Sequence, residues 1–354
     1  MAYINGAANI SPQNTLNYRQ FIQGEVSQNN VFFQSINPDY KEFLTPIEAR
    51  RMSQTVKQGI YCALTALKEA ECKSPKAIIT GTGLGILSDT EKFLENMLKN
   101  EEQFLTPTSF IQSTHNTVAA QIALKLKSHA YNFTYSQKGH SFESALLDAL
   151  LQLDEKKSPV LVGGTDEITA NFFKIFAQTG DWKTRKTSPE NVLDANTNGA
   201  VRGEGTAFFV LSNKAQKHTY AKITALKCLY KPEKEKRQET LHKLLIESGL
   251  NHNDIDFILT GNSGDKRSDK LYQEFLAEEF SGQSSGCFKQ LSGECQTATA
   301  FALWLGANII KHNKVPDFIC SSPKNKKSIN NLLIYNHFFD INHTFILLSK
   351  PAID

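Results

Sequence analysis

The sequence lacks paired cysteine motifs, an excess of charge of one sign, and long apolar runs. Its six cysteines are scattered without CxxC or zinc-type spacing, and 39 basic residues nearly balance 36 acidic ones. These features disfavour a disulfide framework, a cysteine zinc site and binding to nucleic acid or an anionic membrane. No stretch approaches the roughly 20 apolar residues of a membrane span, and no secretory leader precedes the first apolar segment. We therefore expect a cytoplasmic protein without a membrane span, cofactor or metal.

What the sequence does contain is enough apolar residue, 40% of 354, to build one large or two ordinary domains. Strand-like and helix-like segments alternate, which indicates an α/β protein in which helices cover sheets. The expected strands are residues 2–9, 76–83, 133–137, 158–165, 205–213, 220–230, 256–262, 317–322, 330–336 and 343–350. The expected helices are residues 46–70, 88–100, 116–127, 141–155, 239–249, 268–280 and 297–313.

The two halves of the chain resemble each other. In each half a strand ending in small residues, "IITGTGLG" or "ILTGNSGD", precedes an acidic helix, and a turn with a helix of small residues follows. This pattern indicates an internal duplication, with the break near residues 212–222, rather than a short solenoid repeat.

Three glycine clusters, at 81–85, 162–167 and 199–211, punctuate the chain. "GTGLG" at 81–85 lacks the third glycine and the acidic partner of a dinucleotide site. Glycine pairs after strands more often let two backbones pass closely. No nucleotide is expected here.

Taken together, several segments resemble the β-ketoacyl synthases of the thiolase superfamily. They are "VLVGGTDEIT", "NGAVRGEGTAFFVLSNKAQK", "FKQLSGECQTATAFALWLGANIIKHNKVP" and "TPTSFIQSTHNTVAAQIALKLK", the last with Asn116 at the family's asparagine. The resemblance covers nearly the whole chain. It implies the thiolase fold, with two similar βαβαβαββ halves, residues 1–215 and 216–354, in a five-layered αβαβα sandwich.

The resemblance also implies a cysteine nucleophile at a helix N-terminus and two supporting histidines, and this chain has none of them. With Ser141 and Ala145 aligned to the family's serine and alanine, the nucleophile position falls on Gly139. The histidine positions fall on Gly261 and Glu294. We therefore expect no functional catalytic residue at these three positions.

Neighbouring side chains are poor substitutes. His140 and Cys295 each lie one residue beyond a family position, and one residue of a regular helix turns the side chain by about 100°. His140 is therefore interpreted as a packed or interface histidine, and Cys295 as a small apolar core residue. Glu294 is expected to pair with Lys289, either as an ion pair or through a hydrogen bond, although a buried acid of raised pKa is the alternative.

The C-terminal segment "YNHFFDINHTFILLSK" also departs from the family pattern in a way that disfavours catalysis. It stands where the family has a glycine-rich turn with a gating phenylalanine. Loss of those glycines in favour of bulky residues predicts a closed or vestigial pocket. His115, beside Asn116, is interpreted as an interface residue.

These departures favour an inactive chain-length factor, a subunit that pairs with an active synthase. The resemblance implies pairing through the strand "NFTYSQ", and the short chain is similar to those of aryl-polyene or flexirubin-type pigment pathways. The alternatives are an acyltransferase or malonyl decarboxylase that uses Glu294 or His140, or a homodimeric pseudoenzyme. An acyl carrier protein is a further expected partner, with Lys138, Arg202 and Lys289 as basic residues able to meet it.

Overall fold

The computed structural model describes residues 1–24, 29–194, 197–320 and 328–352. Ten strands form one sheet in the order β10-β9-β11-β12-β8-β1-β7-β5-β3-β4. A separate pair is formed by β2 (Phe32–Phe33) and β6 (Arg202–Gly203). The strands of the large sheet are β1 (Ala2–Ile10), β3 (Ala77–Gly81), β4 (Tyr131–Tyr135), β5 (Val160–Asp166), β7 (Gly205–Ser212), β8 (Ala221–Tyr230), β9 (Phe257–Thr260), β10 (Ser285–Cys287), β11 (Asn331–Phe338) and β12 (Asn342–Ser349).

The large sheet consists of two five-stranded groups with the same topology. If the strands of each group are numbered along the chain, both groups read 3-2-4-5-1. Strand directions also agree, because β5, β3 and β4 run parallel, as do β11, β9 and β10, while the remaining neighbours are antiparallel. Among the described residues, the two groups of strands are joined in the sheet by β1 and β8, over three residue pairs. The two similar halves expected from the sequence are therefore confirmed.

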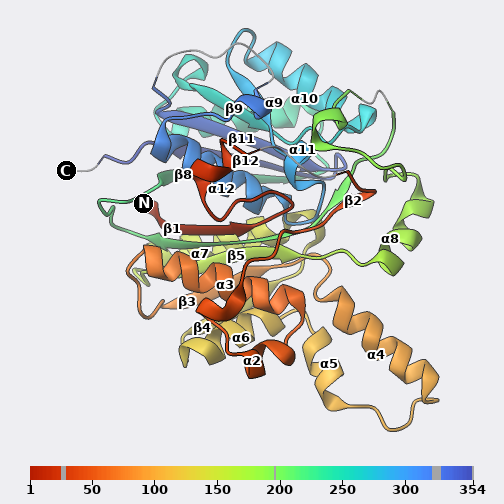
Figure 1. The fold of residues 1–354 in the computed structure, drawn as a ribbon. Coiled ribbons are helices and arrows are strands. Elements are labelled where there is room, and N and C mark those ends of the chain that lie inside the picture. The colour runs from red at the N-terminus through yellow and green to blue at the C-terminus, as the bar shows by residue number, and fades with distance from the viewer. Residues whose placement is uncertain (25–28, 195–196, 321–327, 353–354) are drawn as a thin grey trace.

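The helices complete five layers, as Figure 1 shows. The α-helices are α1 (Tyr18–Phe21), α2 (Pro46–Arg50), α3 (Gln54–Glu69), α4 (Leu87–Lys99), α5 (Pro107–Ser113), α6 (Thr117–Leu126), α7 (Ser141–Asp154), α8 (Ala170–Phe176), α9 (Lys234–Glu247), α10 (Lys266–Glu279), α11 (Lys289–Ser292) and α12 (Ala298–His312). Helices α7 and α12 lie between the two groups of strands, α3 and α6 cover the outer face of the first, and α9 and α10 cover the outer face of the second.

The composition of α12 explains its central place. Every residue from Ala298 to Ile310 is buried, and the helix contacts β1 and β7 of one half and β8, β11 and β12 of the other. A helix that is apolar all round must be covered on all sides. Its small residues permit that close approach, as at Gly306, where an added β-carbon would meet Leu348 at 3.1 Å.

Most expected elements are present, but some boundaries were wrong. The helix expected over 46–70 is two helices, because Arg51 ends α2 and Ser53 stands before α3. Helix α9 begins at Lys234, five residues before the expected start, since its charged first turn carries no apolar pattern while its residues are good helix formers.

One expected strand is wrong. Of residues 317–322, Asp317–Ile319 form the 3-10 helix η6, Cys320 makes a single bridge to Gly286, and residues 321 and 322 lie outside the described residues. Buried β10, with its sequence Ser-Gly-Cys, takes the edge position beside β9. None of the helices described is both long and apolar enough to cross a bilayer.

Candidate functional site

The turn between β4 and α7 carries the position expected for a nucleophile. Lys138 has a left-handed backbone, with φ 52°, and the following Gly139 is buried. The hydroxyl of buried Ser141 donates to the Lys138 carbonyl at 2.7 Å and accepts from the Gln137 amide at 2.8 Å. Ser141 therefore fixes the shape of the turn, and its hydroxyl is fully engaged in doing so.

The space in front of Gly139 is occupied. A β-carbon built there would lie 2.5 Å from the β-carbon of Phe338 and 3.0 Å from Oδ1 of Asn342. Real β-carbons do not approach so closely, and the contacts belong to the β11–β12 hairpin rather than to a flexible side-chain end. Gly139 is required because the hairpin packs against the turn, so no side chain can stand at this position without displacing Phe338.

His140 is tied to the same hairpin. Asn342 Nδ2 donates to His140 Nδ1 at 3.1 Å, so the ring carries its proton on Nε2 and donates it to the carbonyl of His343 at 3.2 Å. Burial lowers the pKa of His140. Both ring nitrogens are engaged and the ring is neutral, which matches the packed histidine expected from the sequence and leaves no free nitrogen for proton transfer.

The first histidine position, Gly261, is also enclosed. A β-carbon there would collide with Oδ1 of Asn336 and lie 2.5 Å from the hydroxyl oxygen of Tyr272. Cε of Lys289 would be 3.1 Å away. Tyr272 is fully buried and stacks on His337 with ring centroids 4.3 Å apart. An imidazole at position 261 would have no room.

The second histidine position holds one partner of a buried ion pair. Lys289 Nζ lies 2.6 Å from Oε2 of Glu294, and both side chains are almost completely buried. The pairing expected from the sequence is confirmed. Burial raises the pKa of the Glu294 carboxyl, and the charge of Lys289 opposes that rise. Lys289 also donates to the His337 carbonyl at 2.8 Å.

These three positions come together at the end of β11. Phe338 fills the space before Gly139, Asn336 closes over Gly261, and the His337 carbonyl accepts from the lysine that pairs with Glu294. The sequence had placed bulky residues in this segment but did not show that it contacts every position. At the three positions expected to be reactive, this chain has packed side chains.

A series of buried hydrogen bonds, which the sequence did not predict, begins at Asn336 in this segment. Asn336 Nδ2 donates to Thr299 at 2.7 Å, and the hydroxyl of Thr299 donates to Oε1 of Glu143 at 2.5 Å. Burial raises the pKa of the Glu143 carboxyl to about 7. An acidic residue on the inner face of a central helix was the available signal, because such a residue must find partners when it is buried.

Other predicted residues are distributed as follows. Cys295 is buried, and burial raises its thiol pKa to about 12, which fits an apolar core role rather than a thiolate. His115 and Asn116 are exposed at the start of α6. Arg202 and Lys289 cannot contact a carrier protein, because both are buried. The Arg202 guanidinium donates to Oε1 of Gln296 at 2.7 Å and lies over the ring of Trp182. That expectation was wrong for them, while Lys138 is exposed.

The topology is that of a thiolase-like fold, and the three positions expected to be reactive are packed. The family model described as "Beta-ketoacyl synthase, N-terminal domain" matches residues 25–247, more than half of the chain. The chain therefore belongs to the β-ketoacyl synthase family. A comparison with curated proteins found no match.

Solved structures share the fold. A β-ketoacyl synthase from Burkholderia phymatum STM815 superposes with a TM-score of 0.82 at 15% identity, covering 99% of each chain. The ishigamide ketosynthase/chain length factor gives 0.80 at 15% identity, again over 99% of each chain. A type II polyketide ketosynthase in complex with its acyl-carrier protein gives 0.77 at 14% identity, over 99% of each chain.

Proposed function

We propose that this protein is a catalytically inactive chain-length factor that pairs with an active condensing synthase of the same family. The observation that carries the proposal is the contact of Phe338 with Gly139, because it leaves no space for a side chain at the position expected for the nucleophile. The closure over Gly261 and the Lys289–Glu294 pair support it, since they occupy the places of both histidines.

The edge of the sheet supports pairing. Strand β4 is the last strand in the order, and within the part of the chain that the structure describes its one pairing is with β3. Along this edge the aromatic rings of Tyr131 and Phe133 stack at 6.1 Å and are 40% and 46% exposed. Neighbouring α7, whose Asp148 accepts from the Tyr131 hydroxyl, adds exposed Leu147 and Leu151. An unpaired strand flanked by exposed apolar side chains is suited to extending the sheet into a second subunit.

Two solved neighbours name functions in keeping with this proposal, one as a ketosynthase/chain length factor and one as a ketosynthase with its acyl-carrier protein. We extend the proposal to a cytoplasmic complex that receives its acyl chain from a carrier protein loaded on the partner synthase. The pathway we favour is the aryl-polyene or flexirubin type, and the halves at 1–215 and 216–354 remain the proposed domains.

The test is co-expression with a family synthase that carries an intact cysteine and both histidines and is encoded beside this chain. Size-exclusion chromatography with mass analysis would measure the complex, and malonyl-carrier decarboxylation and condensation would be assayed for each protein alone and together. We expect a one-to-one complex whose activity requires the partner's cysteine. Decarboxylation by this chain alone would refute the proposal and favour an acyltransferase or decarboxylase, and a stable self-pair that ignores the synthase would favour a homodimeric pseudoenzyme.

A further inference from the structure

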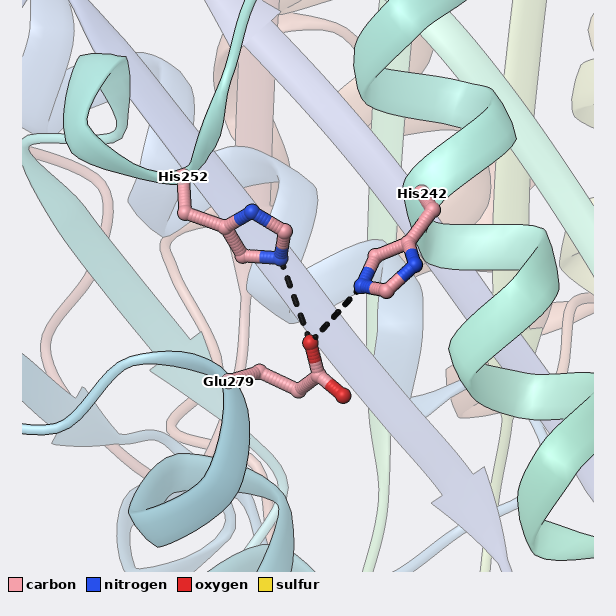
Figure 2. A group of neighbouring side chains, drawn as sticks. All are labelled: His242, His252 and Glu279. Carbon is pink, nitrogen blue, oxygen red and sulfur yellow. Dashed lines mark hydrogen bonds and ion pairs between the residues drawn. The ribbon is translucent and has the colours of Figure 1, made fainter.

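Three side chains converge on the outer layer of the second half, away from the filled site. They are His242 of α9, His252 of the 3-10 helix η5 (His252–Asp254) and Glu279, the last residue of α10. Figure 2 shows both imidazole rings directing a nitrogen at one carboxylate oxygen. The Nε2 atoms of His242 and His252 lie 3.1 and 3.2 Å from Oε2 of Glu279.

The geometry points to a divalent metal site, and we propose that His242, His252 and Glu279 bind Zn²⁺ or a similar transition-metal ion. The three ligand atoms all lie within 4.8 Å of one another. In a tetrahedral zinc site, bond lengths near 2.0–2.2 Å place neighbouring ligand atoms roughly 3.3 Å apart. The two nitrogen–oxygen separations, 3.1 and 3.2 Å, are close to that spacing, and the nitrogen–nitrogen separation is within 4.8 Å.

Two of the ligands are held in place before any ion arrives. The Glu279 carboxylate is only 8% exposed. The ring of His252 packs on Phe280 with centroids 5.3 Å apart, and its backbone carbonyl accepts from Gln283 Nε2 at 2.7 Å. His242 is about half exposed on its helix and can adjust. A site prepared in this way loses less conformational freedom on binding.

The donor set selects the class of ion. Two imidazole nitrogens and one carboxylate oxygen suit Zn²⁺, Co²⁺, Ni²⁺ or Cu²⁺, whereas Mg²⁺ and Ca²⁺ prefer oxygen ligands throughout. Two neutral imidazoles and one carboxylate carry a single negative charge, which a divalent ion overcompensates. The partial exposure of both histidines leaves a fourth position for water.

Binding displaces the hydrogens that the two rings direct at Glu279. Without metal, the Nε2 atom of each ring is placed to donate a hydrogen to Oε2 of Glu279. With metal, each Nε2 gives its lone pair to the ion, and its hydrogen leaves to solvent or to Nδ1. The ion would then tie α9, the turn after it and α10 together over the buried face formed by Leu241, Leu244 and Leu245.

The experiment uses the full chain, freed of metal with a chelator and titrated with ZnCl₂ by calorimetry, with MgCl₂ as the comparison ion. The variants are His242→Ala and Glu279→Gln, and the matched control is His129→Ala, another exposed histidine. We expect one zinc ion per chain for the unmodified protein and the control. Both cluster variants should bind at least roughly tenfold more weakly, the loss that even an outer-shell partner causes.

A second readout is the visible absorption of bound Co²⁺, which reports tetrahedral coordination and should vanish in His242→Ala while remaining in His129→Ala. Equal zinc affinity in all four proteins would overturn the proposal, as would the absence of zinc binding to the unmodified chain. If zinc fails to bind while both cluster variants melt at lower temperature, the group is a hydrogen-bonded clamp without metal, and the proposal is refuted.

Discussion

A β-carbon at position 139 would lie 2.5 Å from the β-carbon of Phe338. The relationship joins the turn before α7 to the hairpin between β11 and β12, about 200 residues later in the chain, across the boundary between the two halves. In the proposed alignment, the absence of a side chain at position 139 and the packing of Phe338 against it are one structural feature, so we do not expect Gly139→Cys alone to create an open site.

The first prediction concerns that contact. Gly139→Cys should show no condensation activity and should lower the free energy of unfolding by about 1–3 kcal/mol, the usual cost of overpacking. Adding Phe338→Gly removes the β-carbon that an added side chain would meet, so it should recover part of the stability but no activity, because Gly261 and Glu294 are unchanged. Urea denaturation and a condensation assay measure both effects. The control is Ser136→Cys, an exposed position in the same turn; condensation by the Gly139→Cys single variant would contradict the site described here.

The second prediction concerns the buried pair. Lys289→Met leaves the Glu294 carboxylate buried without its partner and should reduce the free energy of unfolding by about 3–5 kcal/mol. The double variant Lys289→Met/Glu294→Gln should be clearly more stable than Lys289→Met, since no unpaired charge remains. Chemical denaturation of the singles and the double gives the coupling.

A matched control for the pair is Lys243→Met, which removes an exposed lysine bound to Glu239 and should change little. If Lys289→Met and Lys243→Met had equal effects, the buried pair would contribute nothing beyond a surface contact.

The third prediction is a pH dependence from Glu143. Burial raises its folded-state pKa from 4.5 to about 7. Between pH 4.5 and pH 7 the folded protein binds more protons than the unfolded chain. The contribution of Glu143 to the free energy of unfolding is therefore complete below about pH 4.5 and is lost as the pH rises through 7. Glu143→Gln should remove this dependence of the free energy of unfolding on pH. At pH 8 the variant should be more stable than the unmodified protein by about 2–3 kcal/mol.

Unfolding of both proteins should be followed at several values from pH 5 to pH 8. Burial lowers the pKa values of His337 and His343, which makes the fold less stable as the pH falls below their ordinary value of 6.5. Both proteins share that effect, so the difference between them isolates Glu143. A difference that stays constant with pH would show that Glu143 does not titrate in this range.

The fourth prediction concerns the edge strand. Phe133→Lys places a charge on the exposed aromatic edge of β4. It should weaken association with the proposed partner synthase by roughly tenfold or more, because the charge must be desolvated when the two subunits pair. The control is Ile246→Lys on α9, an equally apolar residue that is 75% exposed. Size-exclusion chromatography with light scattering compares the two. Equal association of both variants would place the interface elsewhere.

Several of these features were predictable because they depend on local chemistry. The apolar runs of β3 and β5 predict buried strands, and the alternating order of strands and helices predicts the layered fold. Small residues along α12 predict a helix packed on all sides. The sequence also predicts the loss of the reactive side chains, because the motifs around Gly139 and Glu294 set the proposed alignment, and this stays a prediction.

Other features could not be predicted because they arise from contacts between distant segments. The contact of Phe338 with Gly139, and that of Asn336 with Gly261, depend on how β11 lies beside β9 and how its hairpin meets the turn. The burial of Arg202, which sequence reasoning placed at the surface, is likewise a property of the packing around Trp182.

The sequence by itself determined the class of fold and the duplicated halves, and it supplied the proposed assignment of Gly139, Gly261 and Glu294 to the family's reactive positions, since each follows from residue type and order along the chain. Only the tertiary structure decided that those positions are filled rather than open, and that His242, His252 and Glu279 meet. Both depend on distances between atoms from separate elements, and such distances are fixed only when the layers pack.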